Sequence, residues 1–151
     1  MTELKRTDGM NKDFLENCEL LDEELDRRSG KILDRNFFRQ FAHTNDITEA
    51  VVAYVDDKPA GAGAIRRYDE TSTELKRMFV RPEYQGMGIA SKICKELEKW
   101  AKECGYQRIL IETGKHLTEA NALYQKMGYS IIPNYPPYEK EETSVCFEKL
   151  I

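Results

Sequence analysis

The segment from Met78 to Ala90, MFVRPEYQGMGIA, constrains the fold more than any other part of this chain. An apolar run typical of a strand is followed by Pro82, by Gly86 and Gly88, and by the start of an amphipathic helix. Backbone N–H groups at a helix start lack partners within the helix and lie at the positive end of its dipole. Glycine leaves out the Cβ atom that would keep an anion away from those donors. The segment therefore predicts a strand–loop–helix unit in which the N–H groups of residues 86–91 bind a phosphate.

The sequence does not match two other kinds of phosphate-binding glycine loop. No Gly-Lys-Ser or Gly-Lys-Thr follows, which excludes a Walker-type nucleotide loop. A dinucleotide fingerprint would need a third glycine at position 91, where the chain has Ser91. An ordinary turn between a strand and a helix remains the alternative, and the order of the surrounding elements favours the phosphate loop.

The remaining pattern predicts alternating helices and strands along the whole chain. Apolar spacing and turn residues predict helices over 12–28, from Asp34, from Gly88 to Gly105 and from Thr118 to Gly128, and strands over 3–7, 47–54, 60–67, 73–80, 108–113, 131–132 and 144–147. The helical crossover after Val80 makes its neighbouring strands parallel, whereas the earlier strands form an antiparallel meander. We expect one α/β (α+β) domain over residues 1–151, with a mixed, mostly antiparallel sheet, a central parallel pair and flanking helices.

These segments resemble the GNAT N-acetyltransferases. Gln85, Gly88 and Ala90 fill the three fixed places of that family's acyl-CoA signature, which is Gln or Arg, two residues, Gly, one residue, then Gly or Ala. The helix with Asn121 and Tyr124, followed by Gly-Tyr, is similar to the family's second cofactor contact. The blocks ELKRMFV, LIETG and SVCFEK are similar to those of bacterial members whose acceptor is unassigned. The resemblance covers roughly residues 47–132 and implies a GNAT fold, acetyl-CoA as cosubstrate, no metal, and acetyl transfer to an amine.

The resemblance also implies which residues bind the cofactor. They are Met78, Phe79, Val80, Gln85, Gly86, Met87, Gly88, Ile89, Ala90, Ser91, Asn121 and Tyr124. Backbone groups of Met78 and Val80 would pair with the pantetheine arm, and an N–H there would face the thioester oxygen. Tyr124 would protonate the leaving thiolate, since a phenol with a pKa near 10 suits that step. The alternative for Tyr124 is a core tyrosine with one edge in water.

Two carboxylates are candidates for the base that removes a proton from the amine. Glu74 opens the cofactor strand, and several family members use a glutamate early on this strand. Alternation along a strand would place Glu74 on the same face as Lys76, Met78 and Val80. Glu112 ends the adjacent strand and is the second candidate.

Both carboxylates have a structural alternative. Glu74 would form an ion pair with Lys76 or Arg77, and Glu112 with Lys115. For each carboxylate, the sequence favours the ion pair and the catalytic role equally. His116 is interpreted as a solvated loop histidine. No cysteine or serine is expected beside a plausible base, so the amine would attack directly in a ternary complex.

Two segments bear on the acceptor. The helix over 12–28 carries six carboxylates, which would attract a cationic amine or form a solvated face; they are Glu16, Glu19, Asp22, Glu23, Glu24 and Asp26. The stiff, aromatic segment from Asn134 to Tyr138 would wall an acceptor pocket or form a strand-breaking loop. A small-molecule amine is the favoured acceptor. A protein amine, or a CoA-binding sensor without turnover, are the alternatives.

Composition excludes several other classes. The formal net charge of −4 supplies no basic surface for nucleic acid. No apolar stretch approaches the roughly 20 residues of a membrane span, and residues 1–6 lack the apolar core of a secretory signal. We therefore expect a cytoplasmic protein without a membrane partner; a homodimer stays open. Cys18, Cys94 and Cys104 fall on apolar helix faces and are expected to be buried, reduced side chains.

Overall fold

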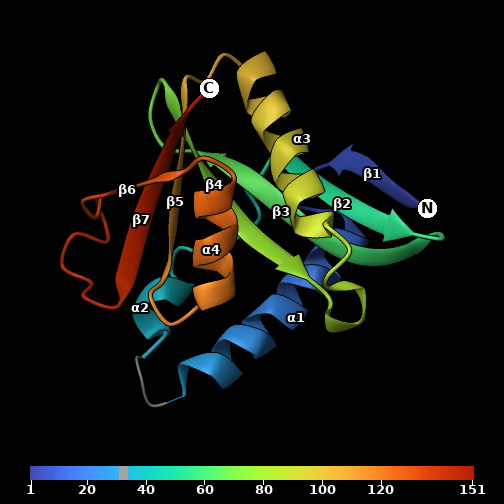
Figure 1. Cartoon of the computed structure of the whole chain (residues 1–151), viewed down its shortest axis with the longest axis horizontal. Coiled ribbons are helices and arrows are strands. Elements are labelled where there is room, and N and C mark those ends of the chain that lie inside the picture. The colour runs from blue at the N-terminus through green and yellow to red at the C-terminus, as the bar shows by residue number, and fades with distance from the viewer. Residues whose placement is uncertain (31–33) are drawn as a thin grey trace.

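The structure is a computed structural model that describes residues 1–30 and 34–151. Its elements, labelled in Figure 1, confirm the predicted order of helices and strands. They are β1 (Thr2–Thr7), α1 (Lys12–Ser29), α2 (Asn36–Arg39), β2 (Glu49–Val55), β3 (Lys58–Arg67), β4 (Ser72–Val80), the 3₁₀ turn η1 (Pro82–Tyr84), α3 (Ile89–Glu103), β5 (Arg108–Gly114), α4 (Thr118–Lys126), β6 (Ser130–Ile132) and β7 (Ser144–Leu150).

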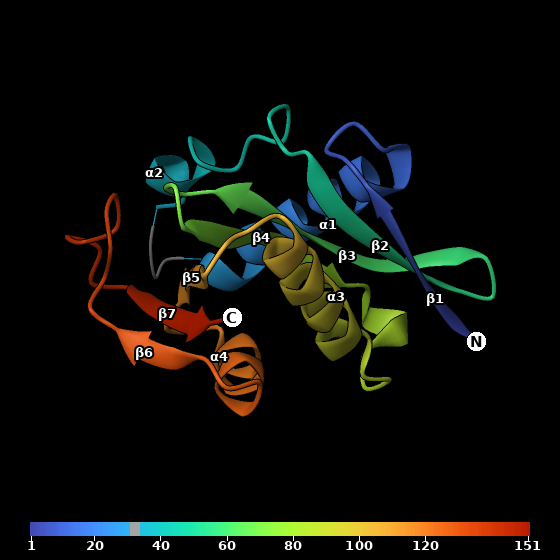
Figure 2. The same ribbon diagram turned by 90° about the horizontal axis from the view of Figure 1, so that it is seen from above.

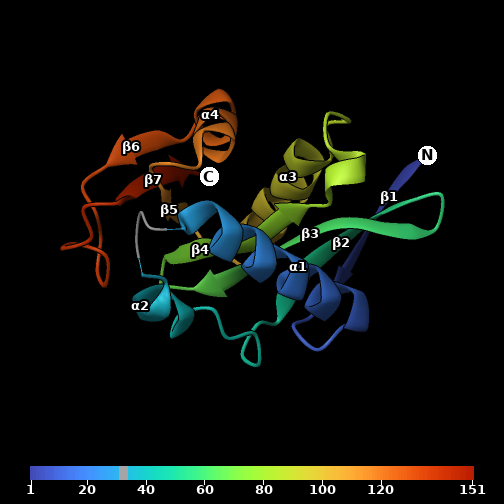
Figure 3. The ribbon, with the colours of Figure 1, turned by 90° about the horizontal axis from the view of Figure 1, so that it is seen from below.

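The strands form one seven-stranded sheet in the order β1-β2-β3-β4-β5-β7-β6. β4 and β5 run parallel and the other pairs are antiparallel, so the predicted mixed sheet is confirmed. Helices α3 and α4 cover one face, and α1 and α2 lie on the other (Figures 2 and 3).

Apolar side chains join each helix to its face of the sheet. Ile93 and Leu97 of α3 and Tyr124 of α4 belong to the largest buried cluster, together with Phe147 of β7. On the opposite face, Phe14 of α1 packs in a second cluster with side chains of β2 and β3. Burying these side chains supplies most of the energy that holds the layers together, about 1.5–3 kcal/mol for each large apolar residue.

The sheet divides in its middle, between β4 and β5. The two strands pair over Ser72–Glu74 and Arg108–Leu110, and their backbones separate beyond those residues. In Figure 1 the two strands diverge on either side of α4, β4 toward α3 and β5 beside β7. A parallel pair that stops after three residues leaves backbone groups along an inner edge of each strand, where a ligand can replace the missing neighbour.

A β-bulge at Arg77 changes the direction of β4 as it leaves β5. The pairing of β4 with β3 shifts between Ala62 and Ala64, and Arg77 has a φ of 58°. This left-handed conformation costs a non-glycine residue about 1–2 kcal/mol. The Arg77 side chain offsets the cost by donating to the Cys18 carbonyl at 2.9 Å and pairing with Asp22 at 2.9 Å, both on α1.

The bulge overturns the predicted strand face. Simple alternation would place Met78 and Val80 on the side of Glu74 and Lys76, and this prediction is wrong. The extra residue moves Met78 and Val80 to the side of α3, where both pack against the largest cluster.

Smaller corrections concern cysteines and helix starts. Cys18 and Cys94 are buried as expected, whereas Cys104 is exposed because it ends α3. The N-cap positions are Arg35 and Leu117, each one residue from the predicted Asp34 and Thr118. Asp34 still accepts a hydrogen bond from the Asn36 N–H at 2.9 Å, so it stabilises the start of α2 as predicted.

Candidate active site

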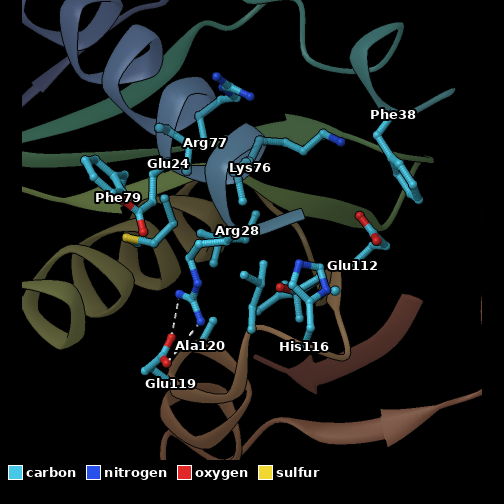
Figure 4. Close-up of a pocket in the computed structure, with 18 of the residues that line it drawn as sticks. Glu24, Arg28, Phe38, Lys76, Arg77, Phe79, Glu112, His116, Glu119 and Ala120 are labelled. Carbon is cyan, nitrogen blue, oxygen red and sulfur yellow. Dashed lines mark hydrogen bonds and ion pairs between the residues drawn. The ribbon is translucent and has the colours of Figure 1, made fainter. Parts of the chain in front are cut away.

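A cavity of about 520 Å³ occupies the place where β4 and β5 separate. Its lining comes from α1, the α2 region, β4, β5 and α4, and Figure 4 shows the side chains that face it. The volume is within the usual range for small-molecule sites. Of the predicted site residues, those that line the cavity are Met78, Phe79, Val80, Gln85, Ala90, Glu112 and Tyr124.

The predicted phosphate loop lies beside this cavity. Gly86 and Gly88 have φ angles of 81° and 75°, and a Cβ added at either would meet open space. Within the described residues, none of the six N–H groups from Gly86 to Ser91 donates to a backbone carbonyl or side chain. Unpartnered amides at the start of a long helix, with no side chain in front of the glycines, fit the diphosphate of coenzyme A.

The end of β4 offers backbone groups to the same cavity. The Arg81 N–H donates to Ala60 of β3 at 2.9 Å, so alternation along the strand directs the groups of Val80 and Met78 toward the gap. Gln85 donates from its side chain to the Val80 carbonyl at 3.1 Å. This hydrogen bond fixes the turn between the strand and the phosphate loop.

Tyr124 reaches the cavity from α4. It is 5% exposed, and its ring makes edge contacts with Tyr129 and Phe147. Burial raises the pKa of its phenol, so the hydroxyl keeps its proton at neutral pH.

Asn121 lies outside the cavity lining. Its Nδ2 donates to the carbonyls of Gly114 and Leu117 at 3.2 and 3.0 Å, which ties the β5–α4 loop to the helix. Its Oδ1 is buried without a protein partner within residues 1–30 and 34–151. Asn121 therefore has a structural hydrogen-bond role and one acceptor left over.

Glu112 lies at the open end of β5 and accepts a hydrogen bond from the Ser144 hydroxyl at 2.7 Å. Removal from water raises the pKa of this carboxyl to about 7, against the opposing effects of Ser144 and Lys76. A carboxyl with that pKa is a competent proton acceptor near neutrality. The expectation that no serine lies beside a plausible base is wrong, because Ser144 comes from β7, 32 residues away in sequence.

Glu74 is held in a different environment. It is 7% exposed and is not part of the cavity lining. Its carboxylate accepts a hydrogen bond from the Tyr135 hydroxyl at 2.6 Å and pairs with Lys76 at 3.4 Å. The ion pair with Lys76, which was the structural alternative for this residue, is present.

His116 lines the cavity rather than lying in solvent. Its ring packs on Gly114, where an added Cβ would be 2.6 Å from the ring. Both ring nitrogens are buried without a partner in the part of the chain that the structure describes. Burial lowers the pKa of the imidazole, so the ring is neutral at physiological pH.

Several side chains line the cavity without having been predicted as site residues. Lys76 and Phe38 lie near Glu112, and Arg28 forms an ion pair with Glu119 at another part of the cavity (Figure 4). Basic and aromatic residues are common, so composition gave no signal for them. Lys76 comes from β4, and the packing of α1 and α2 against the divided sheet brings Arg28 and Phe38 to the site.

The acidic face of α1 is largely used for internal ion pairs. Asp26 lies 2.7 Å from both Arg35 and Arg39, and Asp22 pairs with Arg77. The segment of residues 135–138 behaves partly as predicted, since Tyr138 lines the cavity whereas the Tyr135 hydroxyl binds Glu74.

The described residues show neither a membrane span nor a metal cluster. None of the helices is long and apolar enough to span a membrane. Outside positions 31–33, no group of three or more His, Cys, Asp or Glu side chains is placed to bind a metal ion.

Comparison with known proteins gives the family. The profile described as the acetyltransferase (GNAT) family matches residues 14–129. A protein of Azospirillum brasilense named IAA acetyltransferase is 34% identical over 90 residues, which span 59% of this chain and 59% of that protein.

Solved structures share the fold along nearly the whole chain. One described as an acyl-CoA N-acyltransferase of Klebsiella pneumoniae has a TM-score of 0.82 at 24% identity and covers 99% of this chain and 97% of its own. A GNAT family acetyltransferase of Elizabethkingia anophelis with acetyl-CoA bound has a TM-score of 0.74 at 17% identity, covering 99% and 98%. The likeness at these identities is one of fold, and the family follows from the profile: this chain belongs to the GNAT acetyltransferases.

Proposed function

We propose that residues 1–151 form one acetyl-CoA-dependent N-acetyltransferase domain that acetylates the primary amine of a small molecule. One observation carries the proposal. Glu112 and Tyr124 line the same cavity from β5 and α4, beside a loop of unpartnered amides. A proton acceptor, a proton donor and an anion-binding loop are the parts that acyl transfer from a thioester needs.

The main chain would hold the cosubstrate. The N–H groups of residues 86–91 fit its diphosphate, and the backbone of Met78 and Val80 fits the amides of its pantetheine arm. Acetyl-CoA supplies the acetyl group as an activated thioester. The structure from Elizabethkingia anophelis, whose fold this chain shares, has acetyl-CoA bound and supports this assignment.

The side chains would move the protons. Glu112, with a pKa of about 7, takes one proton from the ammonium, which frees the nitrogen lone pair to attack the thioester carbon, and later releases that proton to solvent. As the tetrahedral adduct expels the thiolate, Tyr124 donates its hydroxyl proton to the sulfur and regains a proton from the nitrogen as the amide forms. Burial raises the pKa of the phenol, which keeps it protonated until that moment and makes it a weaker acid than an exposed tyrosine. The backbone N–H of Met78 or Val80 would stabilise the oxygen that gains negative charge.

A direct transfer fits better than a covalent acyl-enzyme. Ser144 donates its only proton to Glu112, but its side chain is almost wholly buried, and among the described residues no third group orients a base for it. Initial rates with both substrates varied should give intersecting reciprocal plots, as for a ternary complex. Parallel plots would indicate an acyl-enzyme.

The two alternative functions are transfer to a protein amine and acetyl-CoA sensing without transfer. A protein amine needs an open groove, whereas this cavity has a packed wall of Phe38, Phe41 and Tyr138, which suits a small apolar acceptor. A sensor without turnover would need no titratable carboxyl at the gap. Thiol release from acetyl-CoA across a panel of amines and peptides separates these functions: release with small amines supports the proposal, and release with peptides alone, or with none, contradicts it.

A further inference from the structure

Lys76 lies at the part of the cavity where the amine would be deprotonated. Ser72, Thr73 and Glu74 of β4 pair with residues 108–110 of β5, so the same register continued brings Lys76 opposite Glu112, just where pairing has ended. In Figure 4 Lys76, Glu112 and Phe38 are grouped at one end of the cavity. The ammonium and the carboxyl therefore flank the start of the gap.

The ammonium of Lys76 has a donor to spare. It donates to the Tyr138 hydroxyl at 3.2 Å and pairs with Glu74 at 3.4 Å. The Glu74 carboxylate is shared between two partners, because its other oxygen accepts a hydrogen bond from the Tyr135 hydroxyl at 2.6 Å. An ammonium has three N–H donors, and no third protein acceptor is present within residues 1–30 and 34–151. The Lys76 side chain is 13% exposed and lines the cavity, so a ligand there can accept the third hydrogen bond.

The other cations of the lining are more fully paired. Arg28 makes two hydrogen bonds to Glu119, and Arg35 lies 2.7 Å from Asp26. Arg77 lies 2.9 Å from Asp22 and also donates to the Cys18 carbonyl. Among the described lining residues, Lys76 is thus the cation whose charge is least satisfied by the protein.

An apolar wall adjoins this ammonium. Tyr138, which accepts the hydrogen bond from Lys76, stacks with Phe38 at a centroid distance of 6.2 Å and makes an edge contact with Phe41. All three rings line the cavity. A ligand group that contacts them gains energy if it is apolar or aromatic.

We propose that the acceptor is an amine that also carries a carboxylate and an apolar group, as an apolar or aromatic α-amino acid does. Lys76 binds the carboxylate, Glu112 receives the amine and the wall of Phe38, Phe41 and Tyr138 holds the side chain. Polyamines fit poorly, because their second ammonium would lie near that of Lys76. This inference rests on the proposed N-acetyltransferase function.

The test compares two acceptors that differ only in the carboxylate, L-phenylalanine and 2-phenylethylamine, by thiol release from acetyl-CoA. The unaltered protein should have the higher kcat/KM with phenylalanine. Lys76→Met should reduce kcat/KM for phenylalanine about tenfold to a hundredfold, the range for one charge-assisted hydrogen bond, and change that for phenylethylamine less than about threefold. L-leucine and 3-methylbutylamine form a second matched pair.

The ratio between the paired acceptors isolates carboxylate binding. Any effect of Lys76 on Glu112 or on folding acts on both acceptors and cancels in the ratio. Lys76→Arg, which keeps a cation, should retain most of the preference for phenylalanine. If Lys76→Met fails to fold, the ratio of kcat/KM for phenylalanine to that for phenylethylamine, measured in the unaltered protein and in Lys76→Arg, still tests whether the site prefers a carboxylate.

The possible failures are distinguishable. Turnover of phenylethylamine equal to or faster than that of phenylalanine, or an equal loss for both in Lys76→Met, overturns the carboxylate site and leaves the acetyltransferase function standing. If no amine of any class causes thiol release, although calorimetry shows that the protein binds acetyl-CoA, both the carboxylate site and the acetyltransferase function are overturned.

Discussion

The Tyr135 hydroxyl donates a 2.6 Å hydrogen bond to the carboxylate of Glu74, and this contact directs Glu74 away from a catalytic role. The carboxylate is buried, is paired with Lys76 and lies outside the cavity lining. Glu112, on the neighbouring strand, does line the cavity. The two carboxylates therefore have separate tasks, and the proposed base is Glu112.

Glu74→Gln should leave the rate of acetyl transfer within about threefold of the unaltered protein, because Gln can still accept the Tyr135 hydrogen bond. Stability should fall by about 1–3 kcal/mol, since the half-buried Lys76 loses its ionic partner. Denaturant unfolding and the pH–rate profile check this. If the variant loses the inflection near neutral pH while staying folded, Glu74 is the base and the assignment above is wrong.

Glu112→Gln should lower kcat about a hundredfold to ten-thousandfold at pH 8, the usual contribution of a positioned base. The raised pKa sets the direction with pH. Below about pH 7 the carboxyl of the unaltered protein is protonated and cannot accept a proton, so the difference between the two proteins should shrink as pH falls. The kcat–pH profile should rise through about pH 7 in the unaltered protein and lose that step in the variant. An unchanged step would remove Glu112 from the mechanism.

Arg28 and Glu119 join α1 to α4 at the edge of the cavity, by two hydrogen bonds of 2.7 and 3.1 Å. The pair is partly exposed, so its loss should change the free energy of unfolding by less than about 1 kcal/mol. Because both side chains line the cavity, Glu119→Gln should instead raise KM several-fold by letting the two helices separate around the ligand.

The charge-exchanged protein Arg28→Glu/Glu119→Arg should recover part of the affinity lost in either single variant. Glu103→Gln is the matched control, since it breaks a similar ion pair with Arg6 that lies away from the cavity. Equal KM values for Glu119→Gln and Glu103→Gln would show that the pair does not act on the ligand.

The sequence predicted those parts of the site that depend on local order. The phosphate loop follows from Pro82, Gly86 and Gly88 directly after a strand, and neighbouring residues alone produce that geometry. Tyr124 follows from its helix and the glycine after it. The parallel pair follows from the helical crossover after Val80, whereas the place of β7 between β5 and β6 was not predicted.

The remaining features depend on contacts between distant segments. The residues around Arg77 do not predict the bulge. The positive φ of Arg77 is stabilised by contacts with α1, such as the ion pair with Asp22, which lies 55 residues earlier in the sequence. Whether Glu74 or Glu112 faces the cavity depends on Tyr135 and Ser144, which reach them from the far end of the chain. Periodicity cannot predict such contacts, since it describes each element alone.

Binding of acetyl-CoA by Gly88→Ala tests most directly the claim that the amides of residues 86–91 hold the diphosphate. Gly88 and Gly105 both have positive φ, and an added Cβ would meet open space at either, so Gly105→Ala at the far end of α3 is the control for strain. By isothermal titration, Gly88→Ala should bind acetyl-CoA at least about tenfold more weakly than Gly105→Ala, whereas S-acetylpantetheine, which lacks the diphosphate, should bind equally to both. Equal acetyl-CoA affinities in the two folded variants would contradict the account.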